Sequence, residues 1–140
     1  MINLKMSMKN QFGVLAIACC ALFVGCGLGG DSVIGSWENE NGHIFTFRED
    51  GSMTWVYPSG AATDTFELQY RYDASAEPDI LDLYGFEEGP LQGKTLYGIV
   101  NFIDQEGEDV IRCNFNRGED ESVRPEEFVA RRRTLYKRID

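Results

Sequence analysis

The chain holds few side chains that catalysis could use. His43 is the only histidine, and the cysteines are Cys19, Cys20, Cys26 and Cys113. A Ser-His-Asp triad would have to use His43, and no Gly-x-Ser-x-Gly turn is present to expose a serine nucleophile. A zinc site needs three or four histidine or cysteine ligands. We therefore expect no catalytic residue, no metal ion and no cofactor, and we expect His43 to be a surface residue.

Carboxylates gather in three short segments, at residues 87–88, 106–109 and 119–121. Such groups can bind calcium or form the acid–base pair of a glycosidase. None of the three has the spacing of an EF-hand, and all fall where loops are expected. We expect solvated loops that pair with basic residues, including the Arg131-Arg132-Arg133 run before the C-terminus.

Cys26 ends an apolar segment near the N-terminus. Lys5 and Lys9 precede the uncharged residues 12–25, which are too few to cross a bilayer, since a spanning helix needs ~20 apolar residues. The order apolar, small, cysteine in Phe23-Val24-Gly25-Cys26 resembles the lipobox of bacterial lipoproteins. That resemblance implies removal of the segment before Cys26 and acylation of its thiol.

The same resemblance divides the chain into a signal peptide (1–25), a lipidated cysteine with a glycine-rich tether (26–32) and a folded domain (33–140). It implies a lipid bilayer as partner of acylated Cys26. The residue after Cys26 is Gly27 and not aspartate. In a host with two membranes, the resemblance therefore also implies that the protein is anchored in the outer membrane and faces the periplasm. Cys19 is a second candidate for acylation. An ordinary secretory signal and an uncleaved anchor are the alternatives, but the first lacks a small-x-small site and the second needs a longer apolar run.

The charge of the chain narrows the partners of the folded domain. The formal net charge is −10, and removal of residues 1–25, with two lysines and no acidic residue, makes it −12. Nucleic acid requires a basic face, so we expect no nucleic-acid partner. Cys113 would remain as the only cysteine besides Cys26, so no internal disulfide is expected, and its alternation with Ile111 and Phe115 predicts a buried, inert thiol.

Apolar and polar residues alternate with period two from Val33 onward, most clearly over residues 66–73, and no sustained helical pattern is present. This alternation is typical of half-buried antiparallel strands. A single helical turn is expected to begin at Pro125. Turn sequences such as Asn41-Gly42 and Asp50-Gly51 join the strands as hairpins. The expected strands are Gly35–Asn39, His43–Glu49, Ser52–Tyr57, Thr63–Asp73, Ile80–Tyr84, Thr95–Ile103, Asp109–Phe115 and Thr134–Ile139.

Eight short strands joined by hairpins predict an all-β up-and-down barrel or a sandwich, and closure as a barrel would remove exposed edges. Several motifs together resemble small bacterial lipocalin-like domains with no established activity: Gly35-Ser36-Trp37, Asp73 to Pro78 followed by Ile80-Leu81-Asp82-Leu83, Gly93 to Ile99, Ile111-Arg112-Cys113 and Arg124-Pro125-Glu126-Glu127-Phe128. The resemblance implies an eight-stranded antiparallel barrel with Gly35 and Trp37 as a structural motif. It also implies that Arg133 or Arg138 stacks on Trp37 to close the barrel.

Aromatic residues are frequent on the expected inward face. An eight-stranded barrel is just wide enough to be filled by its own side chains or to hold one small ligand. We expect a membrane-anchored, non-catalytic binding module that holds a small apolar ligand in the barrel mouth or, with a filled interior, binds a basic envelope protein through acidic loops. The candidate lining residues are Trp55, Tyr57, Phe66, Tyr70, Tyr72, Tyr84, Tyr97 and Phe102.

Overall fold

The structure, a computed structural model, describes residues 32–128 and 133–140, apart from the side chain of Arg133. The predicted signal peptide, Cys26 and all of the tether except Ser32 therefore lie outside the described residues. Among the described residues, no helix is long and apolar enough to cross a membrane.

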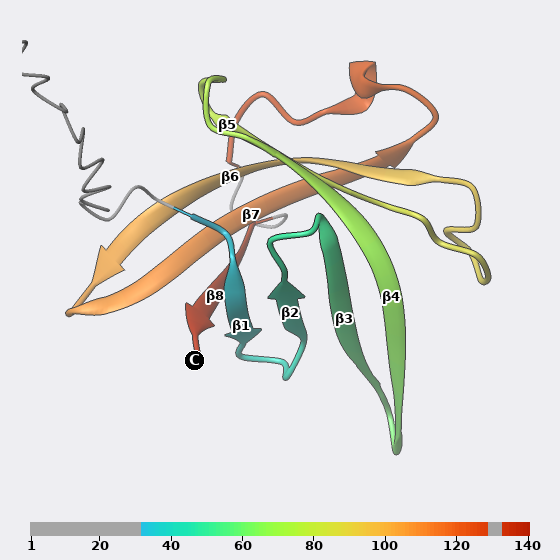
Figure 1. Cartoon of the computed structure of the whole chain (residues 1–140), viewed down its shortest axis with the longest axis horizontal. Helices are drawn as coiled ribbons and strands as arrows, with labels where there is room; N and C mark the ends of the chain where they lie inside the picture. The colour runs from blue at the N-terminus through green and yellow to red at the C-terminus, as the bar shows by residue number, and fades with distance from the viewer. Residues whose placement is uncertain (1–31, 129–132) are drawn as a thin grey trace, which may run out of the picture.

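The described chain forms a closed barrel in which each strand pairs antiparallel with the next and the last pairs with the first. This confirms the predicted up-and-down barrel and excludes the sandwich (Figure 1). The elements are β1 (Gly35–Asn39), β2 (Ile44–Phe47), β3 (Ser52–Ser59), β4 (Ala62–Asp73), β5 (Asp79–Tyr84), β6 (Thr95–Gln105), β7 (Glu108–Gly118), the 3-10 helix η1 (Glu121–Val123) and β8 (Arg133–Arg138).

Two local features differ from expectation. The helical turn is η1, upstream of Pro125, because the Asp120 carboxylate accepts a hydrogen bond from the Ser122 N–H (2.9 Å) and caps it there. The β6–β7 hairpin extends further than predicted, since its turn needs only two residues. Glu106 and Gly107 both have positive φ, 57° and 82°, as a type I′ turn requires.

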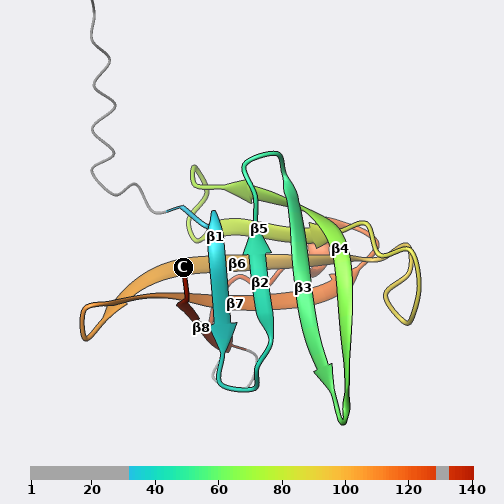
Figure 2. The same cartoon turned by 60° about the horizontal axis from the view of Figure 1, so that its bottom comes forward.

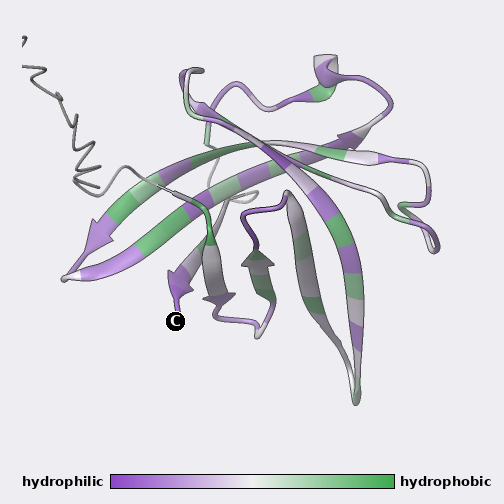
Figure 3. Cartoon of the chain, in the orientation of Figure 1, coloured by the Kyte–Doolittle hydropathy of each residue, from purple (hydrophilic) through white to green (hydrophobic). Residues whose placement is uncertain are grey.

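The barrel interior is filled by apolar side chains. Hydrophobic and hydrophilic residues alternate along β4 (Figure 3), and the alternation places one face of this strand inside. On β6 and β7 residues of both faces are buried, so there the register and not the alternation identifies the inward face. Phe45 lies at the centre, where its ring contacts four others. The buried side chains of the interior include Trp37, Phe45, Phe47, Met53, Leu81, Leu83, Ile111 and Tyr136.

The strands differ in length, so two hairpins project from the barrel. The β3–β4 hairpin and the β6–β7 hairpin extend in different directions, the latter on the same side as both ends of the described chain (Figures 1 and 2). The two chain ends are joined there, because Ser36 N–H donates to Asp140 (2.9 Å) and the Arg138 guanidinium donates to the Ile34 carbonyl (2.9 Å).

Candidate functional site

The register places six of the eight predicted lining residues on the inward side of their strands and two on the outside. Tyr84 pairs with Gln69 and is 37% exposed on the outer face. Tyr97 follows the inward Leu96 on β6, so it also points outward, where its hydroxyl donates to the Glu119 carbonyl (3.4 Å). The prediction that Tyr84 and Tyr97 line the interior is therefore wrong, because both lie on the outer face of the barrel. The inward residues are Trp55, Tyr57, Phe66, Tyr70, Tyr72 and Phe102.

The closing arginine is Arg138 and not Arg133. Strand β8 pairs Arg138 with Trp37, and the guanidinium carbon lies 4.2 Å from the centroid of the indole. Arg133 pairs with Asn114 at the opposite end of β8, so the register keeps it away from Trp37. Gly35 is required beside this contact, because its φ is 123° and a Cβ there would lie 3.0 Å from the Asp140 carboxylate.

The aromatic cluster around Trp55 runs from the core to the surface. The Trp55 ring contacts Phe45 inside the barrel and Tyr57, which is 38% exposed. His43 stacks edge-on against Tyr57 and accepts a hydrogen bond at Nδ1 from Trp55 Nε1 (3.2 Å). Partial burial lowers the pKa of His43, which favours the neutral ring that can accept this bond. His43 is therefore half-buried and not the surface residue predicted. With Trp55, Tyr57 and Phe66 it forms a cluster that we call the aromatic mouth.

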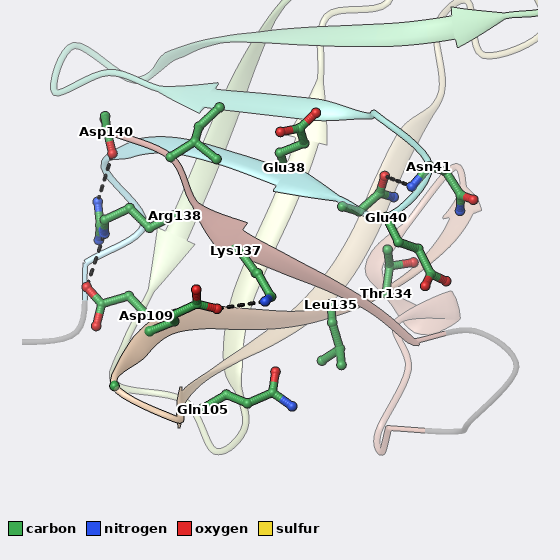
Figure 4. A pocket seen from close by; sticks show the side chains of 14 residues that line it. Glu38, Glu40, Asn41, Gln105, Asp109, Thr134, Leu135, Lys137, Arg138 and Asp140 are labelled. Atoms are coloured by element: carbon green, nitrogen blue, oxygen red, sulfur yellow. Dashed lines mark hydrogen bonds and ion pairs between the residues drawn. The ribbon is translucent and has the colours of Figure 1, made fainter.

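A wide concavity lies outside the barrel. This groove, called the β8 groove below, has a volume of about 1020 Å³ and is bounded by β1, β8 and the tip of the β6–β7 hairpin (Figure 4). The alternating side chains Leu135, Lys137 and Ile139 line it from the C-terminal segment, and Leu135 and Ile139 are 41% and 50% exposed. Its carboxylates are Glu38, Glu40, Glu108, Asp109 and Asp140.

The charges of the β8 groove are unbalanced. Lys137 Nζ lies 2.6 Å from the Glu108 carboxylate, which raises the pKa of the lysine. The Arg138 guanidinium lies 3.2 Å from Asp109. Glu38 on β1 and Glu40 in the turn that follows it are exposed, and within the described part of the chain neither takes part in an ion pair. Five carboxylates against these two cations leave the groove with three excess negative charges.

A buried ion pair fastens the segment after β7 to the outer wall. Asp82 on β5 is 4% exposed, and Arg124 binds its carboxylate with two nitrogens, Nη2 lying 3.0 Å from Oδ2. Gly98 of β6 donates its N–H to Asp82 Oδ1 (3.2 Å), and its carbonyl accepts from Arg124 Nη1 (2.9 Å). The side chains of Asp82 and Arg124 thus bond the backbone groups of Gly98, which forms no backbone pair with β5. We call this ion pair the Asp82 latch. It is structural.

The other candidates from the sequence are Cys113, a possible metal site and the acidic loops. Cys113 is buried, and burial raises the pKa of its thiol, as expected for an inert cysteine. Across residues 32–128 and 133–140, no group of histidine, cysteine and carboxylate side chains is arranged to hold a metal ion. Residues 87–88 and 119–121 are exposed, and Glu119 forms an ion pair with Lys94 (2.7 Å).

The site residues that sequence reasoning missed are those of the β8 groove and the Asp82 latch. Asp82 and Arg124 stand in motifs that carry the lipocalin-like resemblance, but they are 42 residues apart and no local pattern pairs them. Comparison of the chain with family models, with curated proteins and with solved structures finds no match. The candidate site therefore depends on the geometry alone.

Proposed function

We propose that this chain is a lipid-anchored, extracytoplasmic interaction module whose filled barrel is a scaffold and whose β8 groove holds a basic partner protein. The proposal rests on the contrast between the barrel interior and the β8 groove. The interior is occupied by buried side chains such as Phe45 and Met53, whereas the outer groove is large, open to solvent and acidic. A filled barrel gives little room for an enclosed ligand.

The anchor would keep this groove close to a membrane. Acylated Cys26 would be followed by a tether to Ser32 that reaches roughly 20 Å at ~3.3 Å per residue. The described chain leaves the barrel beside Arg138, which also lines the β8 groove. The proposed partner is therefore a protein of the same envelope compartment, at the outer membrane if the host has two membranes.

The groove fits a partner segment that carries cations beside apolar side chains. Lysine or arginine would meet Glu38 and Glu40, which form no ion pair with a described cation, while apolar side chains would cover Leu135 and Ile139. Exposed charges attract one another over about 10 Å at 0.1 M salt and less at higher salt. Binding through this groove is therefore expected to weaken steeply as salt is added.

Removing the two unpaired charges is expected to weaken binding of a cationic probe. We expect Glu38→Gln/Glu40→Gln to lower the affinity of the full-length protein for an acetylated Lys-Leu-Lys-Leu-Lys amide by about tenfold or more, because each contact is worth ~1 kcal/mol in water. Calorimetric titration in non-ionic detergent measures this. The matched control Glu87→Gln/Glu88→Gln removes the same charge outside the groove and should leave the affinity unchanged. Equal losses in both variants would reject the groove as the site.

A second candidate function is binding of a small apolar ligand across the aromatic mouth. It is favoured by the Trp55 cluster, which brings His43, Tyr57 and Phe66 together at the surface. A neutral fluorescent probe, N-phenyl-1-naphthylamine, tests it. Trp55→Ala should lower its affinity at least about tenfold, since one buried aromatic contributes ~1.5–3 kcal/mol. Tyr84→Ala, an exposed aromatic on the outer wall, should not, and equal effects would remove this candidate.

A further inference from the structure

In the described part of the chain, the C-terminal end of β6 has one edge without a partner strand. On one side β7 pairs with β6 along its whole length, to Gln105↔Glu108. On the other side the pairing with β5 ends at Asp79↔Val100. Among the described residues, 101–105 therefore pair with a strand on one side only, and the β6–β7 hairpin runs past the start of β5 (Figure 1). The barrel is closed as expected, but in the described chain closure does not cover this overhanging end of β6.

The register identifies the groups that this edge presents. A two-residue turn makes Gln105 and Glu108 a hydrogen-bonded pair, so the odd-numbered residues of β6 bond to β7. The backbone N–H and C=O groups of the even-numbered residues then point to the edge of β6 that faces β5. Gly98 is one of them, and its N–H and C=O bond to Asp82 and Arg124. Phe102 and Asp104 come next, and the described residues supply no backbone partner for either on this side.

A small pocket lies against the same edge. Its volume is about 430 Å³, and Val100, Asn101 and Phe102 line it in succession. Successive side chains of a strand point to opposite faces. A pocket that contacts all three therefore opens at the edge of β6 and not on one face. Its other walls are the turn before β5, at residues 77–79, and the segment 126–128 after η1.

The walls of this pocket are acidic and its floor is apolar. Glu77, Asp79, Glu126 and Glu127 contribute four carboxylates, and no described lining residue is basic. Apolar contact comes from two partly exposed aromatic rings, Phe102 and Phe128, beside the fully buried Val100.

The wall formed by residues 126–128 is held in place from outside. The Arg112 guanidinium lies 4.6 Å from the Phe128 ring centroid, and its Nε donates to Asn101 Oδ1 (3.1 Å). The Asn114 amide donates to the Glu127 carbonyl (3.0 Å). The pocket therefore exists before any partner arrives.

We propose that the free edge of β6 binds an extended, basic segment of a partner protein by strand addition, in line with β5. Backbone groups of Phe102 and Asp104 would bond the added strand, and alternate lysine or arginine side chains would meet the four carboxylates. A second copy of this chain does not fit, because its formal charge of −10 repels the acidic walls. The site is separate from the β8 groove and does not depend on it.

Hydrogen exchange tests the strand addition directly. The probe is an acetylated Lys-Val-Lys-Val-Lys amide, added to the full-length protein in non-ionic detergent. The Phe102 and Asp104 amides should exchange rapidly in the free protein and at least about tenfold more slowly with the probe. The Asn101 and Ile103 amides should be protected in both states. Absence of binding, or binding without slowing at Phe102 and Asp104, would overturn the proposal.

Two further experiments distinguish strand addition from binding by charge attraction alone. N-methylation of one alternate set of probe amides should lower affinity at least about tenfold, and methylation of the other set should not, since an added strand bonds through one edge only. Glu126→Gln/Glu127→Gln should weaken binding about tenfold, whereas Glu38→Gln/Glu40→Gln in the β8 groove should not. Equal tolerance of both methylated probes would contradict strand addition even if the proposed function stands.

Discussion

Replacing Arg124 by alanine is expected to lower the free energy of unfolding by about 3–5 kcal/mol, because the buried Asp82 carboxylate loses its buried, two-nitrogen partner and keeps only the half-exposed Arg71 as a cation nearby. The Gly98 carbonyl loses its donor in the same step. Urea denaturation of the full-length protein in detergent measures the change. In a domain of this size such a loss corresponds to a fall in Tm of more than about 10 °C.

Arg71 supplies a matched control for this prediction. Its guanidinium lies 3.6 Å from the same Asp82 carboxylate, but its side chain is half exposed. Exposed ion pairs contribute about 0–1 kcal/mol, so Arg71→Ala is expected to change stability little. The double variant Asp82→Leu/Arg124→Met removes both charges and should be less destabilised than Arg124→Ala. If Arg71→Ala and Arg124→Ala lowered stability equally, the Asp82 latch would not have the role assigned to it.

Replacing Phe45 by alanine is expected to cost about 3–5 kcal/mol, the range for a buried phenylalanine whose surroundings cannot collapse. Phe45 is 2% exposed, and its ring stacks on Tyr136 at 4.5 Å between centroids. It also contacts Trp55 and Phe115, which come from two other strands. The loss would therefore leave a cavity in the middle of the filled barrel, and urea denaturation again measures its cost.

Two variants set the scale for the Phe45 result. Tyr84→Ala removes an aromatic ring from the exposed outer wall and should cost far less. Phe45→Leu keeps part of the volume and should fall between the two. A small loss for Phe45→Ala, similar to that for Tyr84→Ala, would mean that the interior is not packed around Phe45 and would weaken the scaffold part of the proposed function.

The strands could be predicted from the sequence because one face of each is buried. In the segment from Phe66 to Tyr72 every second residue faces inward, and the structure keeps that register in β4. The turns followed from glycine positions such as Gly51, whose φ of 85° few other residues adopt. Tyr97 was misplaced because Leu96, Tyr97, Ile99 and Val100 are all apolar or aromatic, so alternation alone does not assign the face.

The candidate site could not be predicted because it depends on contacts between distant strands. The choice of Arg138 over Arg133 follows from the β1–β8 register, which joins residues about a hundred positions apart. The β8 groove exists because the β6–β7 hairpin is longer than β8, and the free edge of β6 exists because β5 is shorter than β6. The alternation already predicts a shorter strand at residues 80–84 than at residues 95–103, but how far one strand overhangs the next depends on their register in the closed barrel, which has no local sequence signal.

The central claim is that the filled barrel binds a basic partner in its β8 groove. Nuclear magnetic resonance of the isotope-labelled full-length protein, titrated with the Lys-Leu-Lys-Leu-Lys amide in non-ionic detergent, tests it most directly. We expect the largest amide shifts at residues of the groove, including Glu38, Leu135 and Ile139, and their loss at high salt. Absence of binding, or shifts confined to other surfaces such as residues 87–88, would contradict the claim.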